Sequence, residues 1–154
     1  MKPQPLSGTR PKRAVIPEEA AYLDLIRTAD MLSRPIAVLL KADDLSPTQY
    51  NVLRILRGCP DGLTCGEIGN RMITRDPDIT RLLDRMEKRN LVYRTREEKD
   101  RRQVLTRITE EGLDTLARLD GPVGDTHRKL LGRLGPERLD ALRELLAACR
   151  EGAA

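Results

Sequence analysis

The hydrophobic positions in residues 77–108 change their spacing part-way along the segment. Apolar residues first recur three and four positions apart, at Ile79, Leu82, Leu83 and Met86. This spacing predicts a helix with one apolar face, and its opposite face is polar and mostly cationic. After Asn90, apolar and polar residues alternate in two short runs, which predict the strands of a β-hairpin. The charged residues 97–102 separate these runs, so the predicted hairpin has a basic tip.

Two shorter helices are predicted ahead of this segment, because each begins with a capping box. In a capping box, the side chain at the helix start and the side chain three residues later bond each other's backbone N–H groups. Ser46 with Gln49 and Thr64 with Glu67 have this spacing, and Leu63 is placed to form a very short third strand. A helix able to lie in a DNA groove, followed directly by a projecting hairpin, is the layout of a winged helix-turn-helix.

Longer helices are predicted at both ends of the chain. Pro17 begins the first, and Pro35 should kink it because proline lacks the N–H that its turn requires. Thr109 caps another, which we expect to be one long helix kinked near Gly121, with two helices as the alternative. A last helix follows it. These helices carry more apolar surface than a small head can bury, so we expect them to form a homodimer.

The predicted fold class is therefore mainly α with a small β-hairpin wing, a winged helix-turn-helix with N- and C-terminal dimerisation helices. Residues 1–16 are expected to form a disordered basic tail, since they are polar and broken by prolines. Residues 17–44 and 109–154 are the predicted helical dimerisation region. Residues 45–108 are the predicted winged helix-turn-helix DNA-binding region.

Three short motifs in this arrangement are similar to those of a known family. They are Thr80-Arg81 on the amphipathic helix, Asp100-Arg101-Arg102 at the hairpin tip, and Thr109 with Gly112 at the start of the next helix. In these motifs, and over roughly residues 17–149, the chain resembles the MarR family of bacterial transcriptional regulators. The resemblance implies a homodimer that binds DNA, commonly as a repressor that a small, often aromatic or phenolic, anion releases.

The amphipathic helix is the candidate for reading DNA. A two-fold dimer carries two such helices and predicts binding to double-stranded DNA with an inverted repeat, whose successive major grooves lie about 34 Å apart. We assign Thr80 and Arg81 to base edges or adjacent phosphates, and Arg75 and Arg85 to phosphates. The alternative for each arginine is a surface salt bridge along its own helix, such as Arg81 with Asp84.

The resemblance assigns further roles at the hairpin tip. Arg102 would enter the neighbouring minor groove, where narrow A·T-rich DNA attracts arginine. Asp100 would hold this arginine or the tip in place, and Arg101 would contact a phosphate.

The two ends of the amphipathic helix are also predicted from local residues. Asp76 is expected to cap its start, and Asn90 lies where relatives usually have glycine, at a position that favours the left-handed conformation. Asp76 and Asp78 suit the helix dipole but repel phosphate. The alternatives for Asp78 are to accept a hydrogen bond from a cytosine amino group or to point into the protein.

The effector that the resemblance implies would bind where the terminal helices meet the head. Tyr22, Tyr50 and His127 are the candidate ligand-binding residues, because an otherwise aliphatic core offers few groups for an aromatic anion. The alternative for each is a structural role, packed or partly exposed.

The net charge is +4, but the basic residues are concentrated in parts of the chain. Residues 71–107 hold 12 basic and 7 acidic residues, residues 1–17 hold four basic and no acidic residues, and the remainder holds 12 basic and 17 acidic residues. The positive field therefore lies on the helix-and-hairpin segment and the tail, as expected for a surface that faces phosphates. The tail either adds salt-sensitive DNA contacts or is passive.

The composition argues against other classes of protein. Cys59, Cys65 and Cys149 have neither the pairing nor the histidine of a zinc site, so no metal or cofactor is predicted. Redox sensing through Cys59 or Cys65 is a minor alternative. One histidine and no phosphate-binding glycine loop leave no recognisable enzyme active site.

The sequence also predicts a cellular location and leaves one alternative function. No apolar run approaches the roughly 20 residues of a membrane span, and the amino terminus lacks a signal peptide, so we expect a cytosolic protein. The alternative function is a winged-helix protein–protein interaction module without an operator.

Overall fold

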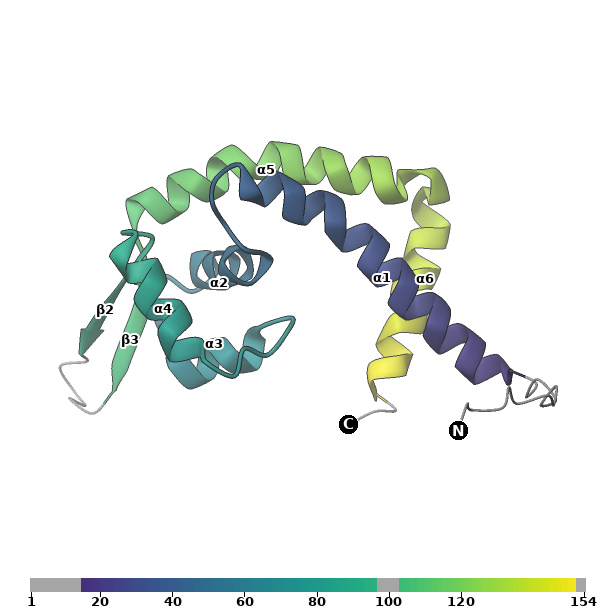
Figure 1. The fold of residues 1–154 in the computed structure, drawn as a ribbon, viewed down its shortest axis with the longest axis horizontal. Helices are drawn as coiled ribbons and strands as arrows, with labels where there is room; N and C mark the ends of the chain where they lie inside the picture. Colours follow the sequence, from purple (N-terminus) through teal and green to yellow (C-terminus); the bar gives the residue numbers. More distant parts are fainter. Residues whose placement is uncertain (1–14, 97–102, 152–154) are drawn as a thin grey trace, which may run out of the picture.

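The computed structural model of the protein describes residues 15–96 and 103–151 (Figure 1). Its elements are α1 (Pro17–Lys41), α2 (Pro47–Arg57), β1 (Leu63–Thr64), α3 (Cys65–Arg71), α4 (Ile79–Lys88), β2 (Val92–Arg96), β3 (Val104–Ile108), α5 (Glu110–Leu131), the 3-10 turn η1 (Gly132–Leu134) and α6 (Gly135–Glu151). The predicted fold class is confirmed, because the chain is mainly helical with one small antiparallel sheet.

The sheet has the strand order β1-β3-β2, and both neighbouring pairs are antiparallel. β2 and β3 form the predicted hairpin, in which Val92 pairs with Ile108 and Arg96 pairs with Val104. β1 is the short third strand predicted at Leu63. Figure 1 shows the hairpin beside α4, projecting from the head on the side away from the chain ends.

Aliphatic side chains form the core between α2, α3, α4 and the sheet. The fully buried aliphatic side chains there are those of Val52, Leu53, Leu56, Ile68, Leu82, Leu83, Met86 and Val92. Leu40 of α1 and Leu116 of α5 belong to the same core, so the head and the nearer parts of the terminal helices are packed together. Burying one such side chain contributes about 1.5 to 3 kcal/mol, which lets an aliphatic core stabilise the head without phenylalanine or tryptophan.

Most helix starts have the predicted caps. Both capping boxes are formed, by Ser46 with Gln49 in α2 and by Thr64 with Glu67 in α3. Thr109 caps α5 and accepts a hydrogen bond from the N–H of Gly112. These contacts join residues three positions apart, which is why the sequence alone predicted them.

The predicted cap of α4 is wrong. Asp78 rather than Asp76 caps this helix, which begins at Ile79, and its carboxylate accepts from the N–H of Arg81 at 3.4 Å. The Asp76 carboxylate accepts instead from the N–H of Asp78, at 2.8 Å. It closes a turn around Pro77, so the helix starts two residues later than predicted. At the other end Asn90 has a φ of 55°, which confirms the left-handed position.

The terminal helices are continuous. α5 runs through Pro122 from Glu110 to Leu131, so it is one long helix rather than two. Pro35 likewise lies inside α1. Figure 1 shows α5 as a long bowed ribbon with α1 below it, and the two helices pack together.

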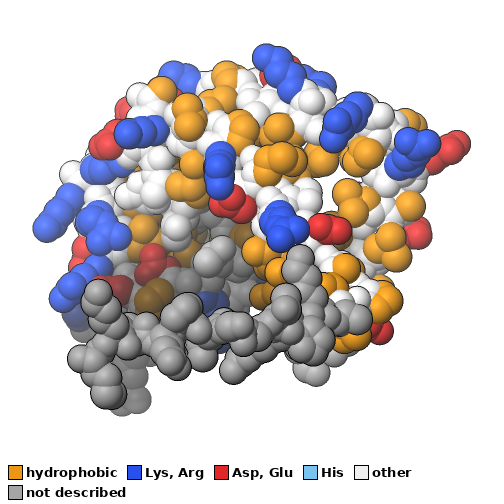
Figure 2. All heavy atoms as spheres, turned by 45° about the vertical axis from the view of Figure 1, so that its right-hand side comes forward, with side chains coloured by type: hydrophobic (Ala, Val, Ile, Leu, Met, Phe, Trp, Pro, Cys, Tyr) orange, Lys and Arg blue, Asp and Glu red, His pale blue; other side chains and the backbone are white. Residues whose placement is uncertain are grey.

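These helices leave much of their apolar surface uncovered. Leu40 is the one buried residue of α1, and α6 has none between Gly135 and Glu151. The exposed large side chains include Tyr22, Leu25, Ile26, Met31 and Val38 on α1, and Leu142 and Leu145 on α6. Figure 2, in which the side that carries α1 and α6 is turned forward, shows hydrophobic side chains at the surface. In residues 15–96 and 103–151, no helix combines the length and apolarity needed to cross a bilayer.

Candidate nucleic-acid interface

α4 has one face in the core and the other in solvent. The buried side chains of the inner face are those of Leu82, Leu83 and Met86. The side chains on the outer face are exposed, and they include Thr80, Arg81, Arg85 and Lys88. Three of the predicted site residues therefore lie on one accessible helix surface, as the apolar spacing predicted.

Arg81 projects into solvent beside the start of α4. Its side chain is 79% exposed, and its Nε lies 3.2 Å from the Asp78 carboxylate. The salt bridge is thus to Asp78, whereas the alternative considered from the sequence was Asp84. An exposed pair of this kind contributes at most about 1 kcal/mol, so Arg81 can exchange Asp78 for another anion at little cost.

Asp84 and Glu87, the other carboxylates of α4, both bind Arg94 on β2. Arg94 Nη2 lies 2.6 Å from Asp84 Oδ1 and 2.6 Å from Glu87 Oε2. The Glu87 carboxylate also accepts from Arg94 Nε at 3.0 Å and from the Arg94 backbone N–H at 3.1 Å. The hairpin base is therefore fastened to the outer face of α4.

This cluster changes the electrostatics of α4. Hydrogen bonding by Arg94 lowers the pKa of Glu87, and hydrogen bonding by Glu87 raises the pKa of Arg94. Each carboxylate on α4 has a cationic partner. Arg85 and Lys88 have no salt bridge within the part of the chain that the structure describes, so the outer face of α4 keeps an excess of positive charge.

The turn between α3 and α4 adds a further cation. Arg75 is exposed there, close in sequence to the start of α4. Cys65 at the start of α3 places its Sγ 3.9 Å from the Thr80 hydroxyl. The start of α3 therefore supports the start of α4, where the predicted base contacts lie.

The hairpin strands carry exposed polar side chains toward the tip. Arg96 and Gln103 are exposed, and the Arg107 guanidinium donates to the Thr95 hydroxyl across the two strands. The predicted wing residues Asp100, Arg101 and Arg102 lie outside the described residues.

Comparison with known proteins identifies the family of this chain. Residues 45–104 match the sequence model of the MarR family. The crystal structure of a MarR transcription factor from Planctomyces limnophilus is 37% identical, covers 89% of this chain and 99% of that chain, and has a TM-score of 0.66. The chain belongs to the MarR family.

Two further relatives are also transcriptional regulators. The transcriptional repressor CouR, in a structure bound to a 23-mer DNA duplex, is 30% identical over 88% of this chain and 92% of that chain, with a TM-score of 0.70. The transcriptional regulator FarR of Neisseria gonorrhoeae is 26% identical over 81% of this chain and 85% of its own length. This MarR protein is therefore a DNA-binding transcriptional regulator and not an enzyme.

The three candidate ligand residues of this MarR protein lie in different surroundings. His127 lines a cavity of about 390 Å³ between α1 and α5, whose other walls include Leu32, Ile36 and Leu130. Tyr22 is exposed on α1. Tyr50 is buried in the core, with the Arg54 guanidinium 5.9 Å from its ring centre. Of the three, only His127 lines this cavity.

The cysteines remain free thiols in this MarR chain. Cys59 accepts a hydrogen bond from Arg71 Nη1 at 2.8 Å, a contact between the end of α2 and the end of α3. Within residues 15–96 and 103–151, no cluster of histidine, cysteine and carboxylate side chains could hold a metal ion.

Sequence reasoning missed Arg94 as a positioning residue of the MarR interface. Asp84 and Glu87 are three residues apart and so share a helix face. Arg94 is the first arginine of the following strand. Two carboxylates on one helix face, followed by an arginine on the next strand, could have indicated an ion-pair cluster. The contact forms only because β2 folds back along α4.

Proposed function

We propose that this MarR protein is a homodimeric repressor that binds an inverted repeat in double-stranded DNA and is released by a small ligand. The cationic outer face of α4 is the observation that carries the proposal. Arg81 and Arg85 are exposed there, while the carboxylates of the same helix are paired with arginines. Because the proposed partner is DNA, we also propose a cytoplasmic location.

The proposed contacts follow the exposed surface of α4. Thr80 and Arg81 would reach base edges or adjacent phosphates in the major groove, which admits one α-helix. Arg75 and Arg85 would bind phosphates on either side. By the resemblance, Arg102 would enter the minor groove, with Asp100 and Arg101 assisting at the wing tip.

The proposed dimer uses the terminal helices, residues 17–44 and 109–154. Its support is the exposed apolar surface of α1 and α6, which a second copy would remove from water. Two copies of α4 could then occupy successive major grooves on one side of the duplex. The repressor role is supported by the likeness to CouR.

The proposed ligand site is the cavity lined by His127, between two of the helices that set the spacing of the heads. A small anion there would alter the position of α5 relative to α1. A coupling free energy of about 1 to 3 kcal/mol between ligand and DNA is enough for a usable switch.

The decisive experiment is selection of bound duplexes from a random pool with the purified protein. We expect an inverted repeat whose half-sites lie one helical turn apart. Arg81→Ala should lower affinity for the selected duplex, whereas Arg128→Ala on α5 removes the same charge and should have little effect. Recovery of no sequence preference would favour the protein–protein interaction module instead.

Two further readouts use the selected duplex. Transcription in vitro from a promoter carrying the site should fall when the protein is added, and a rise would contradict the repressor role. Small aromatic acids would be screened for release of the duplex. His127→Ala should weaken the response to an active acid, and an unchanged response would exclude this cavity as the ligand site.

A further inference from the structure

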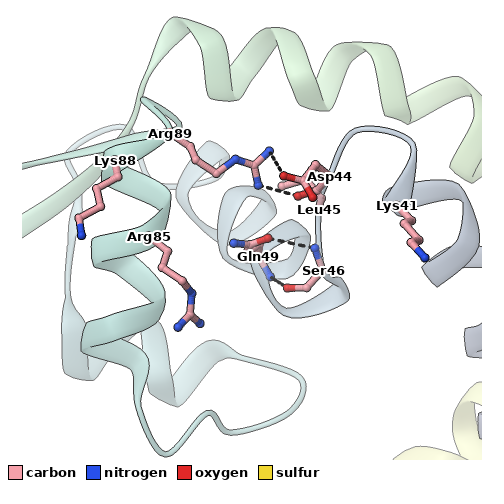
Figure 3. Close-up of a pocket in the computed structure, with 8 residues that line it drawn as sticks. All are labelled: Lys41, Asp44, Leu45, Ser46, Gln49, Arg85, Lys88 and Arg89. Carbon is pink, nitrogen blue, oxygen red and sulfur yellow. Dashed lines mark hydrogen bonds and ion pairs between the residues drawn. The ribbon is translucent and has the colours of Figure 1, made fainter.

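One arginine joins the end of α4 to the connection between α1 and α2 (Figure 3). Arg89 directly follows α4. It donates from Nη1 to the backbone oxygen of Asp44 at 2.6 Å and from Nη2 to that of Asp43 at 3.2 Å. Its side chain is only 32% exposed, so these charge-assisted hydrogen bonds are partly shielded from water. Figure 3 shows the guanidinium reaching across to the connection, along the wall of a pocket of about 500 Å³.

The connection that Arg89 binds is a compact turn with hydrogen bonds of its own. The N–H of Leu45 donates to the Leu40 oxygen at 3.0 Å, and the N–H of Asp44 donates to the Lys41 oxygen at 3.1 Å. These two bonds form the Schellman motif that ends many helices, and Asp44 takes its left-handed position with a φ of 54°. Leu40 and Leu45 are both buried. The turn is therefore anchored in the core.

A second arginine connects α5 to the same turn. Arg118 Nη2 lies 3.4 Å from the carboxylate of Asp43, whose side chain is 28% exposed. The same nitrogen lies 3.2 Å from the hydroxyl of Thr115, one turn earlier on α5. Thr115 is buried, with 3% exposed. Arg118 is thereby oriented on its own helix, and Asp43 is bound by α5 through its carboxylate and by α4 through its backbone oxygen.

The start of α5 provides a separate contact with the end of α4. The Thr109 hydroxyl donates to the Asn90 oxygen at 2.6 Å, and the Thr109 N–H donates to the Leu91 oxygen at 3.1 Å. Arg118 lies about 13 Å further along α5, at about 1.5 Å per residue. A contact at the start of α5 alone would let α4 swing about that point. Two separated contacts fix the angle between the helices.

We propose that Arg89, Asp43 and Arg118 form a polar joint that sets the angle of α4 relative to α5, and that they are positioning residues for DNA binding. The proposal rests on the proposed function, in which α5 belongs to the dimerisation region and α4 enters the major groove. In a two-fold dimer, a change in this angle moves the two copies of α4 relative to each other. The polar joint therefore restricts the half-site spacing that the protein accepts.

Asp43→Asn tests the polar joint with the smallest change. Asparagine keeps the backbone oxygen that Arg89 binds and removes the carboxylate that Arg118 binds. Because Arg118 is 56% exposed, the lost pair contributes little to stability, and the head should fold as before. Asp44→Asn is the matched control. It removes the same charge one residue later, from a side chain that is 95% exposed, and asparagine suits the left-handed conformation.

Hydrogen exchange of the DNA-free protein measures the polar joint first. The N–H groups of Asn90 and Leu91 are hydrogen-bonded to backbone oxygens of α4, so their exchange reports how firmly the end of this helix is held. We expect both to exchange about threefold faster in Asp43→Asn and at the wild-type rate in Asp44→Asn. Unchanged exchange in Asp43→Asn, or equal acceleration in both variants, would overturn the proposal.

Duplexes of altered spacing measure the consequence for DNA binding. The duplex recovered from the random pool would be compared, by fluorescence anisotropy, with versions one base pair longer or shorter between the half-sites. The preference for the recovered spacing should fall about threefold in Asp43→Asn and in Arg118→Ala. Combining the two changes should lower it no further, because both break the same contact. A loss of affinity that is equal at every spacing would mean a purely structural role and would overturn the proposal.

The two measurements separate this proposal from the proposed function. If selection yields no inverted repeat, the proposed function fails, and hydrogen exchange alone decides whether the polar joint holds α4. If an inverted repeat is recovered and Asp43→Asn has the spacing preference of the wild type, the positioning role fails and the proposed function stands.

Discussion

Arg94 on β2 holds the Glu87 carboxylate on α4 through its Nε, its Nη2 and its own backbone N–H. The two residues are seven positions apart and belong to different elements. Their contact fastens the base of the hairpin to the outer face of α4 in this MarR protein.

Arg94→Ala should lower both stability and DNA affinity. It removes the partner of Asp84 and Glu87, which then repel each other on one helix face. We expect the free energy of unfolding to fall by roughly 1 to 2 kcal/mol, a range that allows for partial exposure of the cluster. Urea unfolding and fluorescence anisotropy with duplex DNA would measure the two effects. Arg96→Ala, exposed at the end of the same strand, should change stability by less than about 0.5 kcal/mol.

Acidification should weaken the Arg94–Glu87 contact in a defined direction. The pKa of Glu87 is lowered from its ordinary value of 4.5 in the folded protein, chiefly by hydrogen bonding from Arg94. The unfolded chain therefore binds this proton at a higher pH than the folded chain. The stabilisation is present above the ordinary pKa and is lost as the pH falls through the lowered one. Urea unfolding would be measured from about pH 6 to about pH 3. Over this range the free energy of unfolding should fall less in Glu87→Gln than in the wild type. The same dependence on pH in both proteins would contradict this.

Gly112→Ala should destabilise the junction between the head and α5. A Cβ at this position would lie 2.4 Å from the Leu91 carbonyl oxygen and 2.7 Å from Ile108 Cγ1. Because one obstacle is backbone, α5 would have to shift, at a cost of about 1 to 3 kcal/mol. Gly124→Ala in the same helix is the control, since its Cβ would lie 3.8 Å from Arg128 Nη2, the end of a flexible side chain. Thermal and urea unfolding should leave this control at or above wild-type stability.

Ile26→Glu should convert the proposed dimer into monomers. The side chain is exposed and apolar on α1, where a second copy would bury it. Analytical ultracentrifugation should show the loss of the dimer, and affinity for an inverted repeat should fall about 100-fold or more because the two heads are no longer linked. Ile73→Glu changes an even more exposed isoleucine on the head and should leave the oligomeric state unaltered. A dimer that survives Ile26→Glu would place the interface elsewhere.

Arg102→Ala should lower specific DNA affinity by about 1 to 3 kcal/mol. The resemblance to the MarR family assigns this residue to the minor groove, where its guanidinium would replace counterions. A titration at moderate salt with the selected duplex would measure the loss. Affinity equal to wild type would remove the assignment of Arg102 as the inserted residue.

Much of the fold could be predicted because it depends on residues close together in the chain. The apolar spacing of Ile79, Leu82, Leu83 and Met86 places one face of α4 in the core. The two capping boxes and the left-handed Asn90 are similarly local. The cap of α4 was misassigned because Asp76 and Asp78 both suit a helix start. In the structure Asp76 closes the turn at Pro77, and Asp78 caps the helix.

The candidate site was only partly predictable. Thr80, Arg81 and Arg85 follow from the exposed face of an amphipathic helix. The partners of that helix do not, because Arg94 reaches Asp84 and Glu87 only once β2 lies along α4. The separate surroundings of Tyr22, Tyr50 and His127 also depend on how α1, α2 and α5 pack.

The sequence by itself determined the order of helices and strands, most of their caps, the basic helix-and-wing segment and the motifs of the MarR family. These depend on spacing within one element, where backbone geometry sets which side chains share a face. Only the tertiary structure decided which charges are neutralised and which remain free. Arg94 pairs with α4, while Lys41, Arg85 and Lys88 come from different elements to line one pocket (Figure 3), because contacts between distant elements arise from packing rather than from spacing.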